Sequence, residues 1–440
     1  MPKLSGTFPS VSPLPPSFVQ PASPSLERIH CPLILGGGPA GASAALFLAQ
    51  QGIPSVVLER ARFPRDKICG DAFSGKVVNE LKRLNLAWPA DTLQQVQALP
   101  SWGIRFFAPN RKALDLPFAL DYDPATQTAP GFIATRLAFD NWLAEQAKTN
   151  PLVEFREQQR VRKLAVSPRG VQLELHSGAQ LEAPVVLAAD GANGVGAKQL
   201  AGHRLQRRHH CAAVRWYWQD VNACLSDGFI ELHFQQEVLP GYFWIFPMQD
   251  GRVNVGLGMR SDVLSKRKVN LKKRIQHIVE NHPQIAPRFK GATPLEAPVG
   301  FGLPVGSRRR PLSGPRYLLL GDAGGLIDPF TGEGISNAMI SARHAAAVVA
   351  EHWAAIAAGL VPVQSEWADY DRRVYRRLGR ELQMSTVLQR LSRYPGLFNL
   401  VVNKANRSTE LRNTLSSMFA EVDLRKQFRN PLFYLRVLAA

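Results

Sequence analysis

The chain has 440 residues, 45% of them hydrophobic and 20% charged, which is typical of a globular protein with two or three domains. Its four cysteines lie far apart and form no Cys-x-x-Cys pair, so neither a zinc site nor a disulfide framework is indicated. A reducing, cytoplasmic compartment is therefore expected. The net charge is +18, and half of it falls between Asp371 and Arg436, where 14 Lys and Arg stand against five Asp and Glu.

This basic C-terminal region favours an anionic partner, because its charge attracts anionic lipid, nucleic acid or phosphorylated ligands over a long range. No nucleic-acid-binding motif accompanies it, so no nucleic-acid partner is expected. We expect peripheral contact with the inner face of an anionic membrane, through helices that carry Arg372, Arg373, Arg376, Arg377 and Arg380. The alternative is a solvated basic face that only aids solubility.

In chain order, residues 1–27 come first; they are rich in Pro and Ser without periodicity, which predicts a disordered tail. Residues 32–59 predict a strand, a glycine turn, a helix and a second strand. Two helices are expected between about 74 and 150, and short strands of a small antiparallel layer over 153–189. Aromatic-rich strands and one amphipathic helix near 265–281 follow. A strand over 316–320, a second glycine loop and a long helix from about 333 lead to a helical, basic segment from 364 onward.

The first glycine loop, Gly36–Gly41, fits the pattern Gly-x-Gly-x-x-Gly. Gly36 permits the tight turn, Gly38 lets the backbone approach a pyrophosphate, and Gly41 allows close packing of the helix on the strand. The helix N-terminus then offers free N–H groups and a positive dipole end to the phosphates. Glu59 follows Gly41 by 18 residues, near the spacing expected for an acid on the ribose hydroxyls. The loop therefore predicts a dinucleotide site.

The second glycine loop lies some 280 residues downstream and indicates which dinucleotide is bound. There a strand ends in Gly321-Asp322, where the carboxylate can accept a hydrogen bond from the ribityl chain of a flavin. The segment Thr331–Ile335 then opens a helix, whose N-terminal dipole can stabilise the negative charge of a reduced flavin ring. Between the loops, Asp190-Gly191 also follows an apolar strand. A nicotinamide enzyme needs no second loop of this kind, so FAD is the predicted cofactor.

The order and spacing of these three motifs resemble those of FAD-dependent oxidoreductases with the para-hydroxybenzoate hydroxylase type of fold, over about residues 30–355. Further segments resemble the geranylgeranyl reductase family. The loop Phe63–Asp71 is similar to its K-x-C-G loop, and Arg136–Leu143 to its R-x-x-F-D-x-x-L helix. Residues 240–247, followed by Asn254-Val255-Gly256, are similar to its Y-x-W-x-F-P and N-V-G signature. One departure is that Pro240 stands two residues before Tyr242, where the archaeal pattern has it three before.

The resemblance implies an α/β fold: a glutathione-reductase-type FAD-binding domain with an inserted antiparallel-sheet substrate domain and C-terminal helices. We expect the FAD-binding domain over 28–198 and 301–358, the substrate domain over 199–300 and the helical region over 359–440. Whether 74–135 contributes to the substrate domain is left open. No metal site is expected. The cofactor-binding residues implied are Gly36, Gly38, Pro39, Ala40, Gly41, Glu59, Arg60, Gly70, Asp71, Arg136, Asp190, Asp322, Thr331, Gly332, Glu333, Gly334 and Ile335.

Three further residues are predicted to be catalytic: Cys69, Tyr242 and Trp244. Tyr242, Trp244 and Phe246 alternate along a strand and so share one face, which forms an apolar wall if it lines a cavity and plain core if it does not. The family signature favours the wall, with Cys69 opposite it. Cys69 itself is either a buried small hydrophobe or a redox or proton-donating group near the flavin.

The expected function is reduction of C=C bonds in a geranylgeranyl-type lipid or an isoprenoid quinone, with FAD as cofactor. The electrons are expected to come from NADPH or from another donor, between which the sequence does not decide. The alternative is a flavin-dependent monooxygenase or halogenase of the same fold. Halogenases carry Trp-x-Trp-x-Ile-Pro, from which the segment Tyr242–Pro247 departs at two places. Hydroxylases typically show Asp-Ala-Ala-His at the Gly-Asp motif, whereas here Gly324-Gly325 follow Ala323 and no His is present. Both differences favour the reductase.

Overall fold

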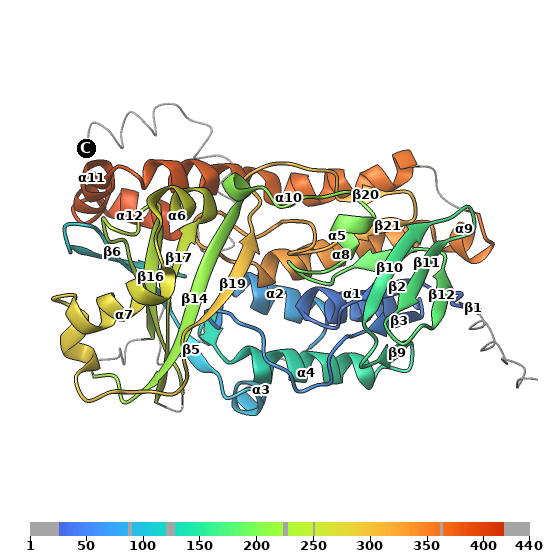
Figure 1. The fold of residues 1–440 in the computed structure, drawn as a ribbon, viewed down its shortest axis with the longest axis horizontal. Helices are drawn as coiled ribbons and strands as arrows, with labels where there is room; N and C mark the ends of the chain where they lie inside the picture. The colour runs from blue at the N-terminus through green and yellow to red at the C-terminus, as the bar shows by residue number, and fades with distance from the viewer. Residues whose placement is uncertain are drawn as a thin grey trace, which may run out of the picture.

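The computed structural model describes residues 26–86, 90–119, 128–222, 228–249, 251–360 and 364–417. Figure 1 shows an elongated molecule, with an α/β part at one end and a large sheet at the other. Residues 1–25, most of the predicted tail, lie outside the described residues, as do Cys224 and the end of the predicted helical region from 418 onward.

A six-stranded sheet forms the centre of the α/β part, in the order β20-β21-β13-β2-β3-β9. Its inner strands are short and wholly apolar, as strands covered on both faces must be. Ile34 and Leu187 face a layer of helices, whereas Leu33 and Val186 face a second, smaller sheet. The strands are β2 (Leu33–Leu35), β3 (Ser55–Leu58), β9 (Val153–Arg156), β13 (Val186–Ala188), β20 (Ser313–Gly314) and β21 (Tyr317–Leu319).

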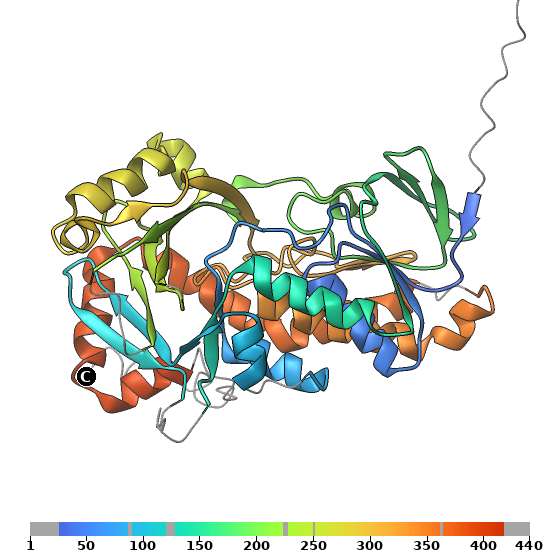
Figure 2. The same ribbon diagram turned by 90° about the horizontal axis from the view of Figure 1, so that it is seen from below.

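The helical layer lies on one face of this sheet, with α4 in front of α1 and α8 in Figure 2. Alanine-rich α1 packs closely on α8, which brings the two glycine loops to the same edge of the sheet. Where the sequence predicted one long helix from about 333, the structure has two: α8 ends at Glu351, and α9 starts at Trp353. The helices are α1 (Pro39–Gln50), α2 (Gly75–Arg83), α3 (Ala90–Gln95), α4 (Arg136–Lys148), α8 (Ile335–Glu351) and α9 (Trp353–Ala357).

The opposite face of the central sheet carries a four-stranded sheet in the order β1-β12-β11-β10. Leu26 and Glu27, which the sequence assigned to the tail, lie in β1 and pair with β12. Of the predicted antiparallel layer over 153–189, only β10–β12 belong to this sheet; β9 and β13 join the central parallel sheet. The bounds are β1 (Leu26–Arg28), β10 (Val161–Val166), β11 (Val171–Leu175) and β12 (Gln180–Ala183), with the short α5 (Gly196–Gln199) after β13.

The second part is built on an eight-stranded sheet in the order β18-β14-β17-β16-β15-β6-β7, with β19 also pairing with β14. In the described residues its pairings are antiparallel except that of β15 with β6. Residues 103–117 supply β6 and β7, so part of the 74–135 stretch lies in this sheet. Its strands are β6 (Gly103–Phe107), β7 (Ala113–Pro117), β14 (His210–Gln219), β15 (Phe229–His233), β16 (Gly241–Pro247), β17 (Arg252–Arg260), β18 (Thr293–Pro294) and β19 (Val299–Pro304).

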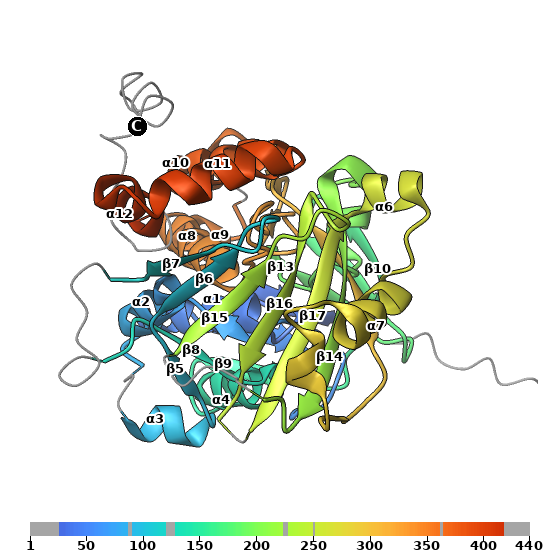
Figure 3. The same cartoon turned by 90° about the vertical axis from the view of Figure 1, so that its left-hand side faces the viewer.

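The outer face of this sheet is covered by a helix, which Figure 3 shows lying across β14 and β17. The sequence predicted one helix near 265–281, but the structure has two, α6 (Ser261–Arg267) and α7 (Leu271–Asn281). Lys268 ends the first in a left-handed conformation with φ of 53°, and the Asn270 side chain caps the second by accepting a hydrogen bond from the Lys273 amide.

Two further elements join the parts. A three-stranded sheet, β4-β8-β5, links them below α2, and the 28-residue helix α10 runs along both (Figure 1). Trp367 and Tyr370 of α10 are fully buried against α8. Among the described residues, none of the helices has both the length and the apolar character that crossing a bilayer requires. The bounds are β4 (Ala72–Phe73), β5 (Leu99–Ser101), β8 (Gly131–Ile133), α10 (Gln364–Leu391), α11 (Pro395–Ala405) and α12 (Thr409–Ser417).

Candidate active site

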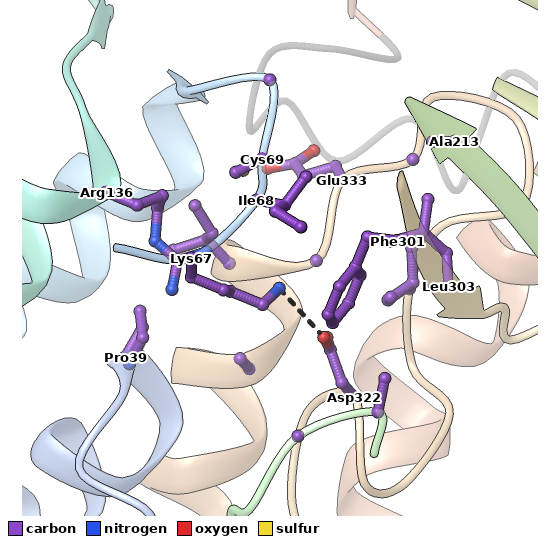
Figure 4. A pocket seen from close by; sticks show the side chains of 18 of the residues that line it. Pro39, Lys67, Ile68, Cys69, Arg136, Ala213, Phe301, Leu303, Asp322 and Glu333 are labelled. Carbon is purple, nitrogen blue, oxygen red and sulfur yellow. Dashed lines mark hydrogen bonds and ion pairs between the residues drawn. The ribbon is translucent and has the colours of Figure 1, made fainter. Parts of the chain in front are cut away.

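A cavity of about 470 Å³ lies where the glycine loops meet the eight-stranded sheet. Every residue that the sequence proposed for the site lines it except Gly41. Gly41 instead lies against the turn before it: a Cβ there would be 1.7 Å from the Gly36 carbonyl oxygen. This geometry fits its predicted role in close packing, whereas its contact with a cofactor stays a prediction. Figure 4 shows Pro39, Cys69, Arg136, Asp322 and Glu333 around the cavity.

The first glycine loop forms one end of the cavity. Gly36 has φ of 90° between β2 and α1, a conformation that favours glycine. Among the described residues, the one atom within 4 Å of a Cβ built on Gly38 is a guanidinium nitrogen of Arg65, at 3.4 Å, so the backbone at Gly38 is open. Glu59, at the end of β3, is buried and accepts hydrogen bonds from the Gly37 and Ala61 amides at 2.8 and 2.9 Å. The loop and the acid are thus held together before any ligand binds.

Two carboxylates follow the strands of the central sheet. Asp190, after β13, accepts a hydrogen bond from the Gly196 amide at 2.8 Å, while its Oδ1 is buried without a partner among the described residues. Burial raises the pKa of Asp190. Asp322, after β21, lies 3.3 Å from the Lys67 ammonium, the contact drawn in Figure 4. The Lys67 ammonium also sits 4.8 Å from the centre of the Phe301 ring.

The second glycine loop is shaped by Asp328, for which the sequence predicted no role. Its Oδ1 accepts hydrogen bonds from the Phe330 and Thr331 amides, at 2.9 and 2.8 Å, and from the Thr331 hydroxyl. Gly332 adopts a φ of 76°, and α8 begins at Ile335 directly behind it. The first turn of a 17-residue helix therefore faces the cavity with its free N–H groups.

The opposite end of the cavity is an apolar wall. Tyr242, Trp244 and Phe246 share one face of β16, with successive rings 6.1 and 6.2 Å apart, which confirms that they point to one side. Phe243 and Ile245 point to the other side, under α7. The Tyr242 hydroxyl donates a hydrogen bond to the Thr331 carbonyl and so ties the wall to the second glycine loop. More apolar lining comes from Ile104, Phe118, Ile230, Leu232 and Phe234.

The loop that carries Cys69 lies beside this wall, not opposite it as the sequence suggested. A Cβ on Gly70 would be 3.0 Å from the Phe246 ring and 3.7 Å from Trp244 Nε1. Asn254 of β17 makes the connection: its amide nitrogen donates to the Cys69 carbonyl at 2.9 Å, and its oxygen accepts from Trp244 Nε1 at 2.9 Å.

Arg136, at the start of α4, borders the cavity next to Cys69. It is 3% exposed and forms a two-bond ion pair with Asp140, at 2.6 and 2.7 Å, one turn along the helix. Burial alone would lower the pKa of Arg136, but Asp140 and then Cys69 oppose this and the pKa is raised. Arg65 reaches Asp140 at 2.7 Å from the other side. The site thus holds a permanent, buried positive charge near the Cys69 thiol.

Three polar residues of the site have no role predicted from the sequence. They are Asn254, which belongs to the family signature, and Tyr217 and Arg215 on β14. Tyr217 and Arg215 alternate along β14 with Trp216 and Trp218, so the two sets point to opposite faces of the sheet. The sequence pattern alone does not show which set points toward the cavity; the fold does.

Comparison with known proteins identifies the family. A family model described as an FAD binding domain matches residues 32–358. The chain is 30% identical over 332 residues to digeranylgeranylglycerophospholipid reductase 2 of Methanopyrus kandleri, covering 72% of this chain and 76% of that protein. It is 29% identical over 330 residues to menaquinone reductase of Mycobacterium tuberculosis, covering 71% and 75%.

The fold agrees with these matches. The solved structure of a geranylgeranyl bacteriochlorophyll reductase-like protein from Thermoplasma acidophilum superposes with a TM-score of 0.75 at 22% identity, over 92% of this chain and 99% of that one. The α/β fold and the FAD cofactor predicted from the motifs are thereby confirmed. The chain belongs to the geranylgeranyl reductase family of FAD-dependent oxidoreductases.

Proposed function

We propose that the protein reduces isolated C=C bonds in the prenyl chain of a lipid or an isoprenoid quinone. The observation that carries this proposal is that one cavity joins both glycine loops to an apolar wall. A prenyl chain has no groups for hydrogen bonding, so it must be selected by the shape of an apolar surface. The relatives described above are named as reductases of digeranylgeranylglycerophospholipid and of menaquinone, which supports this substrate class.

The residues of the site fit FAD. We infer that Glu59 and Arg60 bind the adenosine ribose, and that the open backbone at Gly38 with Pro39 and Ala40 takes the pyrophosphate. Asp190 and Asp322 would face the middle of the cofactor, where Asp190 Oδ1, which has no partner among the described residues, can accept a hydrogen bond. The segment Thr331, Gly332, Glu333, Gly334 and Ile335 would lie against the flavin ring, with Gly70, Asp71 and Arg136 on its other side. When bound and reduced, FAD supplies the hydride for the C=C bond.

The three residues proposed to be catalytic have distinct surroundings. Tyr242 is held by its hydrogen bond to Thr331, and burial raises the pKa of its hydroxyl, so it stays neutral and fixes the position of the wall. Trp244 lines the cavity, and its indole N–H donates a hydrogen bond to Asn254. Cys69 lies between Arg136 and Gly70, at the junction of wall and loop.

A lipid substrate would have to reach the apolar wall from a membrane. Two of the arginines expected to bind the membrane already form ion pairs within the protein, Arg373 with Glu351 and Arg377 with Glu381. The end of α10 offers a different face, defined here as the α10 tip: the exposed side chains Val387, Arg390, Leu391, Arg393 and Tyr394.

The α10 tip combines apolar and basic side chains, as surfaces that bind anionic bilayers do. Val387, Leu391 and Tyr394 are 50%, 41% and 64% exposed. On the other side of the same turns, Gln389 and Ser392 line the cavity. We therefore propose peripheral contact at the α10 tip, with the cytoplasmic protein taking its lipid from the inner face of the membrane.

The test uses the FAD-loaded protein under anaerobic conditions, with NADPH as the proposed electron donor and dithionite as a donor-independent control. Geranylgeranyl lipids and menaquinone are offered separately, and the products are analysed by mass spectrometry. A gain of two hydrogens per reduced bond is expected. If products appear only when oxygen is admitted, and carry an added oxygen or halogen, the protein is a monooxygenase or halogenase instead. If dithionite supports turnover and NADPH does not, only the proposed donor is wrong.

A further inference from the structure

Reduction of a C=C bond consumes a proton as well as a hydride, and the structure contains a buried acid next to Cys69 that the sequence assigned to cofactor binding. Asp71 is 0% exposed and lines the cavity with Cys69 and Gly70. Its Oδ2 accepts hydrogen bonds from the Tyr217 hydroxyl and, at 2.8 Å, from the Asn254 amide. Its Oδ1 is buried and has no partner among the described residues.

The direction of each hydrogen bond is fixed by the neighbours. Arg215 can only donate, and its guanidinium lies 3.0 Å from the Tyr217 oxygen, so the Tyr217 hydrogen must point to Asp71. Trp244 Nε1 can also only donate, so it faces the oxygen of the Asn254 amide and leaves the nitrogen toward Asp71 and the Cys69 carbonyl. Both partners of Oδ2 are therefore donors, and a proton on this carboxyl must reside on Oδ1.

We propose that Asp71 holds on Oδ1 the proton that reduction of the C=C bond consumes. This inference rests on the proposed function. As the hydride adds to one carbon, the O–H bond of Asp71 breaks and its proton forms the C–H bond at the other carbon. The carboxylate left behind keeps its hydrogen bonds from Tyr217 and Asn254, and a proton from solvent restores the acid. No other oxidant or reductant is needed.

The surroundings of Asp71 allow its carboxyl group to be either protonated or ionised. Burial raises the pKa of Asp71 to about 6, while Tyr217, Asn254, Arg215 and Arg136 oppose the rise. Tyr217 and Arg215 face it from β14, Asn254 from β17 and Arg136 from α4. Asp66 and Glu296 in turn pair with Arg215, at 3.0 and 3.1 Å. An acid with a pKa in this range can both hold and release a proton near neutral pH.

The first measurement needs no substrate. Infrared difference spectra of the FAD-loaded protein between pH 5 and pH 8 should show the carbonyl band of a protonated carboxylic acid that titrates and is missing in Asp71→Asn. The variant is close to isosteric, and its amide NH₂ can stand where Oδ1–H stands, so it should fold and retain FAD. Tyr217→Phe removes one donor to the carboxylate and should move the titration to higher pH. A spectrum identical in Asp71→Asn and wild type would overturn the inference.

The second measurement follows anaerobic reoxidation of the reduced protein by a prenyl lipid. The wild-type rate should fall about tenfold per pH unit above the pKa of Asp71, since only the protonated form donates. Asp71→Asn should be about 10²–10⁴-fold slower and lose this dependence. If wild type and Asp71→Asn turn over alike with the same pH profile, the inference is wrong and the proposed function stands. If wild type is not reoxidised by any prenyl lipid at any pH, the proposed function fails, and the proton-donor role fails with it even when the infrared band titrates.

Discussion

Replacing Asp71 by Asn should make the protein more stable at neutral pH, although it removes a residue of the active site. In the folded chain the carboxyl is fully buried, and burial raises its pKa from 3.8 to about 6. At neutral pH the folded protein therefore carries a buried carboxylate, one oxygen of which has no partner in the part of the chain that the structure describes, whereas in the unfolded chain the same group is solvated. The Asn side chain has a similar shape and no charge to bury.

The size of the effect follows from the linkage between protonation and folding. Because the folded state holds the proton more tightly, the stability due to this group is fully present below pH 3.8 and is lost as pH rises through about 6. A shift of about 2 units corresponds to about 3 kcal/mol in total. Between pH 4.5 and pH 7.5 the wild type should lose about 2 kcal/mol that Asp71→Asn retains.

The assay is urea unfolding at these two pH values, followed by tryptophan fluorescence, for the wild type and Asp71→Asn. Since other groups titrate in both proteins, the informative quantity is the change with pH of the difference between their free energies of unfolding. Glu145→Gln, which replaces an exposed carboxylate on α4, is the control and should show no comparable change. A difference between wild type and Asp71→Asn that is the same at both pH values would refute the reasoning.

Three further predictions concern the first glycine loop, the apolar wall and the α10 tip. Gly38→Val should abolish FAD binding while the apoprotein folds, because the added Cβ enters the open backbone face, where the nearest atom among the described residues is an Arg65 guanidinium nitrogen at 3.4 Å. Gly41→Ala should instead destabilise the protein, since its Cβ would lie 1.7 Å from the Gly36 oxygen. Thermal unfolding measured with and without FAD separates the two effects. Trp244→Ala should keep FAD and its reduction but slow reoxidation by prenyl lipid more than tenfold, as measured by stopped-flow absorbance; loss of FAD or of folding would show that Trp244 is core. Replacing Arg390 and Arg393 by Gln should weaken the free energy of binding to anionic vesicles by about 2 kcal/mol, roughly 1 kcal/mol per charge, as measured by co-sedimentation at several salt concentrations. The same change at Arg373 and Arg377, which pair with Glu351 and Glu381, should have little effect and is the control. Binding that is insensitive to salt would contradict the proposal.

Much of the cofactor half could be predicted from the sequence because its requirements are local. Short sequence motifs predict these features, because each depends on residues close together in the chain: the turn at Gly36, the spacing to Glu59 and the helix start at Ile335. The alternation of Tyr242, Trp244 and Phe246 likewise follows from the geometry of a strand.

The substrate half could be predicted only in part because it depends on long-range pairing. Residues 103–117 join the large sheet through the parallel pairing of β6 with β15, more than 100 residues downstream, and no local pattern signals this register. In the same way Asp71 meets Tyr217 and Asn254 only once β14 and β17 pair. The sequence could therefore predict that Asp71 lies near the cofactor, but not that its Oδ1 has no partner within the described ranges.

The central claim is that a reduced flavin in this cavity passes its electrons to a prenyl double bond. The most direct measurement is a single turnover: the FAD-loaded protein is photoreduced without oxygen or NADPH, mixed with a geranylgeranyl lipid, and followed by flavin absorbance and mass spectrometry. The account predicts that the oxidised flavin spectrum returns and that one C=C bond gains two hydrogens for each flavin oxidised. A flavin that stays reduced with every prenyl lipid, and is oxidised only when oxygen is admitted, would contradict it.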